Sequence, residues 1–470
     1  GGGRKGCARG LVRQTLSEVS RNARCAYPEL DLASLETLIA ALNSPNDDKV
    51  LATVELLAEQ NRVHLVPALI LYHPSPAVTV RALELFVQSG RDDFVPLADR
   101  LLQRNSPEVR AATLRALAWV SPSAELYERF AYDPAPEVRA AALVGWVSYG
   151  RSFKVVGARG TLERLVNEGT LDEKRAVATA IRYSPGPVFS DMLLRLAQTP
   201  VSAVRKPVAR AMREILDPVF IPALLDMLAH RAERTEARRT LVAIGPEALR
   251  QLDAMLGNPN SNRAVRKQIP RAIAEFEPKE AAAILMRHLL KVADGGVRYR
   301  VLRALGWLRA RHPALPLDRD LLERGIHETI TGIFRLVHWE ALLIRGTREN
   351  AERATVVQGL LFDLLKHREA LALERLFRLL GLLYPEEEVR DMYRGLTNGS
   401  AAARASSMEL LENLLSPRMR KAVLALVDDI SDMEKVDESG QYYLPDAATD
   451  EDMLRALLEH GGTSLRCLAV

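Results

Sequence analysis

NSPEVRAATLRALAWV, residues 105–120, contains the clearest structural pattern in this chain of 470 residues. Serine, here Ser106, is among the residue types that cap a helix, and proline, here Pro107, is favoured at the first helical position. The apolar residues that follow, among them Val109, Leu114 and Leu117, recur at the spacing of one helix face. The stretch therefore predicts a helix that begins at Pro107 and buries one side.

The same pattern recurs along most of the chain at a spacing of about 30 residues, which is within the range of helical repeats. Each unit consists of a predicted helix, a polar turn rich in Asn, Asp, Ser and Pro, and a second predicted helix of smaller residues. One such hairpin cannot bury its own apolar face, so neighbouring hairpins must stack. The sequence thus predicts an all-α solenoid of helical hairpins.

The two most regular second helices, NSPEVRAATLRAL (residues 105–117) and DPAPEVRAAALVGW (residues 133–146), resemble the HEAT repeats of the short bacterial kind. The segments TLDEKRAVATAI, RTEARRTLVAIG and SNRAVRKQIPRAI are similar to them but lack either the valine or the turn proline. The resemblance implies a HEAT-like α-α superhelix of the armadillo type. It is specific for architecture and implies no particular reaction or ligand.

Regularity divides the chain into four parts. Residues 1–30 are predicted to form a basic linker or extension, and residues 31–312 an array of HEAT repeats. Residues 313–385 lack clear Asn/Pro turns and predict longer helices within the solenoid, whereas residues 386–470 return to the repeat. An acidic segment near 428–452 lacks the pattern of a calcium-binding loop and predicts an exposed, mobile loop. Within it, Tyr442, Tyr443 and Leu444 form a candidate docking tag.

Composition and a second resemblance indicate the setting of the protein. Three isolated cysteines without CxxC spacing favour a reducing, cytoplasmic location, and no long uninterrupted apolar segment is present. Segments such as LERLFRLLGLLYPEEEVRDMYRGL (residues 373–396) are similar to the soluble HEAT region of some bacterial membrane proteins related to ATP/ADP translocases. This resemblance implies that the chain, which opens without an initiator Met, is the cytoplasmic module of a larger membrane protein.

An arginine recurs at one position of the repeat, at the start of the second helix. In one interpretation each arginine meets an acidic or carbonyl group of an adjoining turn, such as Asp133, and so forms a structural ladder. In the other, the planar guanidinium groups form a row of cations for phosphates. Val50 and Thr79 occupy the position in the first two units, and the arginines that follow are Arg110, Arg139, Arg175, Arg205, Arg238, Arg266, Arg298, Arg404 and Arg466.

The basic residues gather in the centre of the chain. Residues 200–311 contain 21 Lys and Arg but only 11 Asp and Glu, although the net charge of the whole chain is only +4. Stacked repeats would align these residues into a stripe for nucleic acid or an anionic membrane surface, whereas the simpler interpretation is a solvated basic face. The candidate stripe consists of Arg205, Lys206, Arg210, Arg234, Arg238, Arg239, Arg263, Arg266, Lys267 and Arg271.

Aromatic and histidine residues give weaker signals. Trp119 and Trp307 occupy matching repeat positions, which predicts packing between units. Some HEAT proteins are DNA glycosylases that use aromatics and an acid, so Trp146 or Trp339 is a formal alternative. The histidines His327, His338 and His367 have acidic neighbours but lack the HExxH spacing of a zinc site.

The sequence contains no motif for nucleophilic catalysis or nucleotide binding. We therefore expect a non-catalytic scaffold that binds a protein partner of unknown identity, with no catalytic residue, metal or cofactor. The alternative is a nucleic-acid-binding or DNA-glycosylase-type HEAT protein that uses the basic section of residues 200–312.

Overall fold

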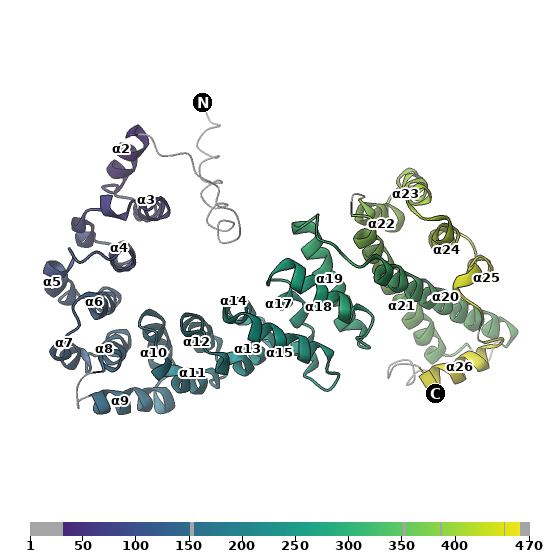
Figure 1. The fold of residues 1–470 in the computed structure, drawn as a ribbon. Coiled ribbons are helices and arrows are strands. Elements are labelled where there is room, and N and C mark those ends of the chain that lie inside the picture. The colour runs from purple at the N-terminus through teal and green to yellow at the C-terminus, as the bar shows by residue number, and fades with distance from the viewer. Residues whose placement is uncertain (1–31, 151–154, 351–353, 386–387, 446, 461–470) are drawn as a thin grey trace. The chain divides into compact units, whose positions relative to one another are not determined.

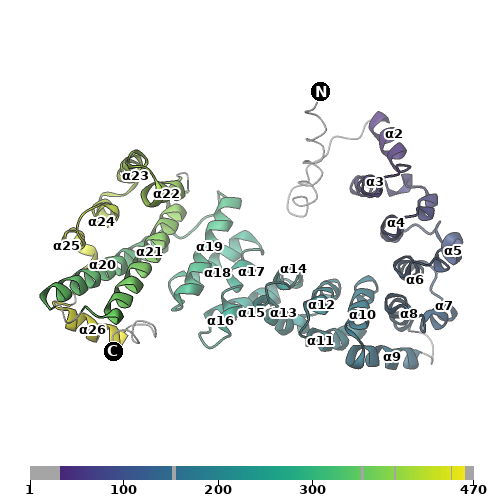
Figure 2. The same ribbon diagram turned by 180° about the vertical axis from the view of Figure 1, so that it is seen from behind.

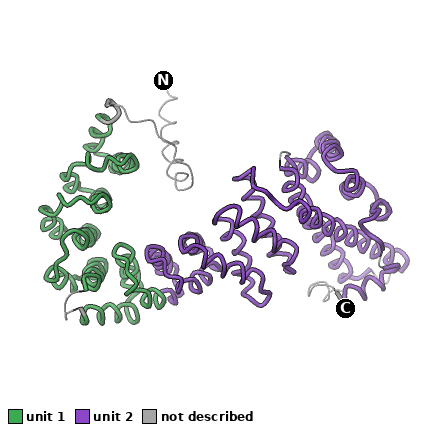
Figure 3. Tube along the Cα trace, viewed as in Figure 1, with its two compact units in different colours: residues 1–196 green, residues 197–470 purple. Residues whose placement is uncertain are grey.

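The computed structural model describes residues 32–150, 155–350, 354–385, 388–445 and 447–460, and these residues contain helices and turns but no strand. The chain divides into two compact units, residues 1–196 and residues 197–470 (Figure 3). The predicted all-α class is confirmed. The predicted extension 1–30, the three cysteines and Arg466 lie outside the described residues.

Unit 1 consists of hairpins whose second helices carry the repeat pattern. Short 3-10 turns at Val63–Leu65, Ala68–Tyr72, Val95–Leu97 and Pro187–Phe189 replace or precede some of the first helices. The α-helices are α2 Leu32–Ala41, α3 Asp47–Glu59, α4 Pro76–Gln88, α5 Ala98–Leu102, α6 Pro107–Val120, α7 Ala124–Phe130, α8 Pro136–Tyr149, α9 Val155–Glu168, α10 Leu171–Tyr183 and α11 Ser190–Ala197 at the boundary.

Helix α6 begins where the sequence predicts. Ser106 has an extended backbone, and its hydroxyl accepts a hydrogen bond from the Val109 amide at 3.3 Å, while Pro107 takes the first helical position. Glu108 lies in the first turn, where a negative charge is favourable next to the helix dipole. The helix buries Val109, Leu114 and Leu117 together with its alanines. The small alanine side chains let neighbouring helices pack closely on more than one side.

The second helices of unit 1 stack on one another in chain order. Helix α4 packs against α6, α6 against α8, and α8 against α10, and both ribbon views show them following one another in a row (Figures 1 and 2). One continuous apolar cluster extends from Leu42 to Ala142. Stacking of hairpins along this cluster, rather than a separate globular centre, is what holds the unit together, as expected for a solenoid.

Unit 2 begins with the same stacking and then changes. Helix α12 packs against α14, α14 against α17, and α17 against α19. The unit contains a 3-10 turn at Pro218–Phe220 and the helices α12 Ser202–Ile215, α13 Ile221–Ala229, α14 Arg234–Ile244, α15 Pro246–Gly257, α16 Arg263–Arg266, α17 Ile269–Ile273, α18 Pro278–Leu289, α19 Gly295–Arg311, α20 Arg319–Glu349, α21 Val356–Leu383, α22 Val389–Asn398, α23 Ala401–Leu414, α24 Pro417–Val427, α25 Asp432–Asp437 and α26 Asp450–His460.

Helices α20 and α21 form a long pair of 31 and 28 residues that contact each other along their length. Helices α24, α25 and α26 pack back onto α20. A second apolar cluster joins the pair to α26, because Trp339 and Leu365 belong to the same cluster as Met453 and Leu457. The last described residues of unit 2 are thus folded against the long pair.

The acidic segment near 428–452 is not a single loop, so that part of the prediction was wrong, although several of its acidic residues, such as Asp428 and Glu434, are exposed. It contains α25 and a 3-10 turn at Gly440–Tyr442, and Tyr442 and Tyr443 are buried against α20. The ring of Tyr442 lies 4.8 Å from that of His327, and the Tyr443 hydroxyl lies 2.9 Å from Nδ1 of His338. Of the three residues of the proposed docking tag, only Leu444 is exposed.

Among the described helices, none combines the length and the apolar character needed to cross a membrane.

Candidate binding surfaces

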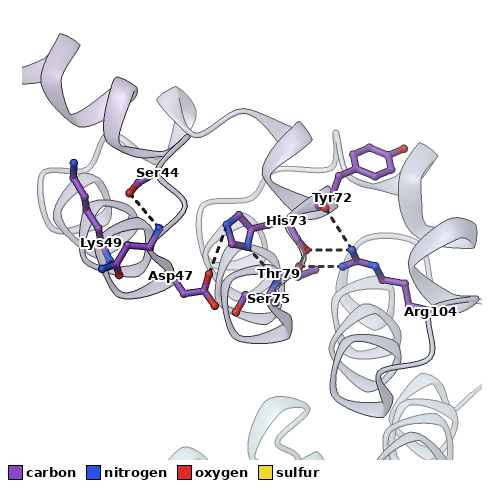
Figure 4. A network of polar contacts seen from close by, with 9 residues as sticks. Ser44, Asp47, Lys49, Tyr72, His73, Ser75, Thr79 and Arg104 are labelled. Atoms are coloured by element: carbon purple, nitrogen blue, oxygen red, sulfur yellow. Dashed lines mark hydrogen bonds and ion pairs between the residues drawn. The ribbon is translucent and has the colours of Figure 1, made fainter.

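A ladder of polar contacts links the turns at the start of unit 1 (Figure 4). In the first turn, Asn46 caps α3 by accepting a hydrogen bond from the Lys49 amide. Asp47, the first residue of that helix, lies 4.0 Å from Nε2 of His73 in the next turn, and Nδ1 of His73 accepts a hydrogen bond from the Ser75 amide at 3.1 Å. Each turn is therefore fixed both locally and to its neighbour.

The second turn has Thr79 where later units have arginine, and an arginine from the following unit takes over the contact. Arg104 donates to the hydroxyl of Thr79 at 3.2 Å and to the carbonyl of His73 at 3.1 Å (Figure 4). It also reaches the carbonyls of Leu71 and Tyr72, both at 3.4 Å. A guanidinium group has five N–H donors, which suits it to several acceptors of one turn.

Arg110 and Arg139 continue the ladder through the units that match the repeat best. Arg110 donates to the carbonyls of Arg104 and Asn105, and its other nitrogen lies 3.0 Å from the carboxylate of Asp133. Arg139 in turn donates to the carbonyl of Asp133 at 2.8 Å and to the carboxylate of Glu173 at 2.5 Å. Both ion pairs are largely shielded from solvent. The contacts join three successive turns.

The remaining arginines at the recurring repeat position bind acids, carbonyls or both. Arg175 is half exposed and pairs with Asp172 at 3.1 Å, while Arg205 is buried and lies 3.2 Å from the buried Glu233. Arg266, Arg298 and Arg404 donate to main-chain carbonyls. A carbonyl contact alone leaves the guanidinium charge without an opposite charge nearby.

In the unit of α14, the carbonyl contacts belong to Arg234 and not to Arg238. Arg234 donates to the carbonyls of Leu228 and Ala229, which lie six and five residues earlier, and Arg110 has the same offsets. Arg238 lies one turn further along the helix, 3.5 Å from Glu275. The sequence alignment places Arg238 at the recurring arginine position, but the residue that makes the contacts is Arg234, four residues earlier. The alignment cannot distinguish them because this helix has arginine at both positions.

The candidate basic stripe is largely compensated within unit 2. Glu236 alone lies near Arg210, Arg213 and Arg239. Lys206 and Lys267 make no ion pair with any described residue. The other ion pairs of the stripe join Arg205 to Asp226 and Glu233, Arg238 and Arg271 to Glu275, and Arg263 to Asp294. This compensation reduces the positive potential that the residue count suggests.

A polar and aromatic cluster crosses the face that the second helices of unit 1 form. We name Glu84, Arg115, Trp119 and Tyr183 the Tyr183 cluster. The Tyr183 hydroxyl at the end of α10 donates to Glu84 of α4 at 2.7 Å, and the indole N–H of Trp119 in α6 donates to the Tyr183 carbonyl at 3.1 Å. Residues of the first, second and fourth of four stacked helices therefore meet, so this face is concave.

Electrostatics make the Tyr183 cluster a structured polar site. The Arg115 guanidinium lies 4.3 Å from the centre of the Tyr183 ring, and burial lowers the pKa of Arg115. Burial and the hydrogen bond to Glu84 raise the pKa of the Tyr183 phenol. Glu84 is itself held by Arg81, which forms a second, bidentate ion pair with Glu55 of α3.

Trp119 is the exposed member of this cluster. Its side chain is 63% exposed, so the prediction that it packs between units was wrong. Its equivalent, Trp307, lies under two guanidinium groups, with Arg271 at 3.8 Å and Arg311 at 4.5 Å from the ring centre. An exposed tryptophan held in place by a hydrogen bond, among charged side chains, is the kind of residue that anchors protein interfaces.

The glycosylase alternative has no matching geometry. Trp146 and Trp339, its candidate aromatics, are both buried in helix packing and not exposed to a ligand. In the part of the chain that the structure describes, no three His, Cys, Asp or Glu side chains gather closely enough to hold a metal ion.

No sequence pattern predicts the Tyr183 cluster. Glu84 and Tyr183 are 99 positions apart, and Trp119 and Tyr183 are 64 apart. The curvature of the stack brings such positions together, and no local pattern encodes it. The repeat spacing could have placed these residues on the same helix face, but not within hydrogen-bond distance.

A family model supports the repeat assignment over part of the chain. Residues 64–145 match the HEAT repeats family model. Similar solved structures include an engineered protein, with 18% identity, TM-score 0.23 and coverage of 93% of this chain and 97% of that chain. The karyopherin Kap121p bound to the extreme C-terminus of the phosphatase Cdc14p has 14% identity, TM-score 0.25 and coverage of 95% and 70%. Kap121p bound to Nup53p has 13% identity, TM-score 0.25 and coverage of 95% and 71%.

These likenesses, all at low TM-score, add no evidence on what this chain binds. No curated protein matches it. The HEAT match covers α4, α6 and most of α8, which include the exposed Trp119 and two rungs of the ladder. It identifies this part of the chain as HEAT repeats.

Proposed function

We propose that the chain is a non-catalytic scaffold that binds a protein partner through the concave face of unit 1. The exposed Trp119 at the centre of the Tyr183 cluster carries this proposal. Aromatic residues and arginines dominate the binding energy of protein interfaces, particularly where their side chains are already ordered before binding. Trp119 is ordered by its bond to Tyr183, and Arg115 lies over the same tyrosine ring.

The charges around Trp119 favour a partner with mixed polar and apolar character. Arg115 of the cluster and the neighbouring Arg81 are matched by Glu84 and by Glu55 next to it, so the surface has no large excess of one sign. Nucleic acid requires a net positive surface because phosphate contacts supply most of the affinity. This face of unit 1 therefore suits a protein better than a polyanion.

Affinity capture with a matched pair of variants tests the proposal. Nuclease-treated lysate is passed over the immobilised wild-type chain, Trp119→Ala and Tyr132→Ala, because Tyr132 is also an exposed aromatic, at 82%, but lies outside the cluster. We expect one or more proteins that bind the wild type and Tyr132→Ala equally well. Their binding free energy for Trp119→Ala should be weaker by at least about 2 kcal/mol. Equal binding to all three chains contradicts the proposal. Binding of duplex DNA at low salt that is lost with increasing salt supports the nucleic-acid alternative instead.

The resemblance of residues 373–396 to ATP/ADP translocase-related proteins supports a narrower proposal, in which this scaffold is the cytoplasmic module of a larger membrane protein. The reading frame upstream of Gly1 tests it. Several apolar segments long enough to span a bilayer are expected there, and a start codon within a few residues contradicts the narrower proposal without affecting the first.

A further inference from the structure

A small pocket opens between α18, α19, α20 and α21 in unit 2. Four leucines and Gly325 line it together with four polar residues, namely Arg298, Glu328, Thr329 and Arg375. Its volume of about 30 Å³ exceeds the roughly 10–15 Å³ that a single water needs, so an ion of a few atoms can enter.

The pocket lies where the arginine ladder loses its acidic partner. Arg298 is the register arginine of its unit and donates from Nε to the carbonyl of Val292 at 3.0 Å. Arg110 and Arg139 meet a carboxylate of the following turn, Asp133 or Glu173. After α19 the chain continues into the long pair, and α21 is the helix that packs on α19. It brings a second guanidinium, that of Arg375, to the pocket, and the Glu328 carboxylate that α20 brings there forms no ion pair with either arginine.

Arg375 has no partner among the described residues. Its Nε atom is fully buried without a hydrogen bond, and no carboxylate oxygen of the described residues lies within 4.0 Å of either Arg375 or Arg298. Burial lowers the pKa of Arg375, and the charges of Arg298 and Arg368 lower it further. The rest of the Arg375 side chain is only partly buried, so water screens part of its charge, and the exposed Glu328 at the same pocket forms no ion pair with it.

We infer that the pocket between α18, α19, α20 and α21 binds a phosphoryl group through Arg298 and Arg375. Two guanidinium forks in one small site provide the bidentate donors that phosphate oxygens accept. Thr329 donates its hydroxyl hydrogen to the Gly325 carbonyl at 2.7 Å and so adds no donor. Glu328 is exposed and its negative charge opposes the bound anion, which limits the affinity of the site. The inference does not depend on the surface proposed in unit 1.

Two sources could supply the phosphoryl group, namely free inorganic phosphate and a phosphorylated side chain of a bound protein. Calorimetric titration of the full chain at constant ionic strength separates them. The titrants are inorganic phosphate, a short phosphoserine peptide and the same peptide without phosphate. Tighter binding of the phosphopeptide assigns the pocket to a partner side chain, whereas tighter binding of inorganic phosphate assigns it to the free ion. Either result, with no binding of the unphosphorylated peptide, supports the inference.

Three variants locate the binding. Arg375→Met should weaken phosphate binding at least about tenfold, because it removes a charge-assisted bidentate contact. Glu328→Gln should tighten binding severalfold because it removes a repulsive charge. Arg324→Gln, an exposed arginine on α20 that does not line the pocket, should change the affinity less than about twofold, since exposed charges are screened.

Circular dichroism of each variant shows whether it folds. If Arg375→Met does not fold, the predicted tighter binding by Glu328→Gln still tests the inference. Absence of saturable binding of both phosphate and phosphopeptide by the wild type overturns the inference. Equal weakening by Arg375→Met and Arg324→Gln also overturns it, because the effect would then come from general charge and not from the pocket.

Discussion

The ladder of unit 1 and the Arg298 site of unit 2 use the same residue in opposite electrostatic settings. In unit 1, Arg110 and Arg139 each bind main-chain carbonyls and a carboxylate of the next turn. In unit 2, Arg298 of α19 also binds a carbonyl, but no carboxylate pairs with it and α21 supplies Arg375. A repeat thus retains its scaffold contact where its charge compensation is absent. Such a position is available for an external anion.

Unit 2 itself contains a compensated arginine for comparison, and its loss should have the largest effect. Arg205 and Glu233 are both buried, 3.2 Å apart, and Ser202 donates a further hydrogen bond to Glu233 at 2.7 Å. Arg205→Met should destabilise α12 and α14 by about 3–5 kcal/mol, because it leaves a buried carboxylate without its cation. Hydrogen exchange of peptides from these helices measures the loss. The double variant Arg205→Met with Glu233→Gln should recover most of the lost stability. A loss below about 1 kcal/mol in the single variant would show that this pair does not hold the helices together.

Packing provides a second comparison between the units. A Cβ at Gly145 of α8 would lie 2.8 Å from the ring of the fully buried Tyr127, whereas one at Gly325, beside the pocket, would lie 3.3 Å from the flexible end of Leu290. Gly145→Ala should therefore cost about 1–3 kcal/mol through overpacking. Gly325→Ala should cost less, since Leu290 can move and alanine favours the helix by about 1 kcal/mol. Thermal unfolding of both variants tests this order, and a larger loss for Gly325→Ala would contradict it.

The pH dependence of unit 2 sharpens the contrast between paired and buried charges. Glu340 of α20 is fully buried, and burial raises its pKa to about 7 although Lys366 lies 2.6 Å away. Glu369 and Asp432 lie on the other sides of the same lysine. The folded state therefore binds more protons than the unfolded state between about pH 4.3 and 7, so stability should fall as pH rises through this range.

Glu340→Gln should abolish that fall, which hydrogen exchange of α20 peptides at a series of pH values can measure. Asp294 provides the opposite case, because its hydrogen bond from Arg263 lowers its pKa to about 2. The stability that Asp294 contributes is present above about pH 4 and is lost as pH falls towards 2. Asp294→Asn should reduce only this loss of stability at acid pH. If the stability of Glu340→Gln still falls as pH rises towards 7, the fall does not come from Glu340.

The comparison also shows how far sequence could predict this molecule. Periodicity and the Ser106 cap predicted the start of α6, because both depend on residues within one turn. The expected partner Asp133 of Arg110 lies in the following turn, within reach of repeat spacing. The alignment at Arg238 differs by one helical turn from the observed contact of Arg234, since both positions hold arginine and spacing alone cannot choose.

Contacts between distant repeats could not be predicted. The Glu84–Tyr183 bond depends on the curvature of unit 1, and the meeting of Arg298 with Arg375 depends on α21 folding back onto α19. The burial of Tyr442 and Tyr443 depends on α25 packing on α20. The acidic composition of this segment predicts exposure instead. These features come from tertiary packing, and no local sequence pattern indicates them.

A matched pair of substitutions, Arg110→Met and Arg375→Met, tests the account most directly. The measurement is the free energy of local opening by hydrogen exchange, for α6 and α8 in the first variant and α19 and α21 in the second, in phosphate-free buffer. Arg110→Met should lower the opening free energy by about 1–3 kcal/mol, because Asp133 and two carbonyls lose their donor. Arg375→Met should leave it unchanged or raise it, because an uncompensated cation is replaced among leucines. Equal destabilisation by the two variants would contradict the distinction between a compensated rung and an open one.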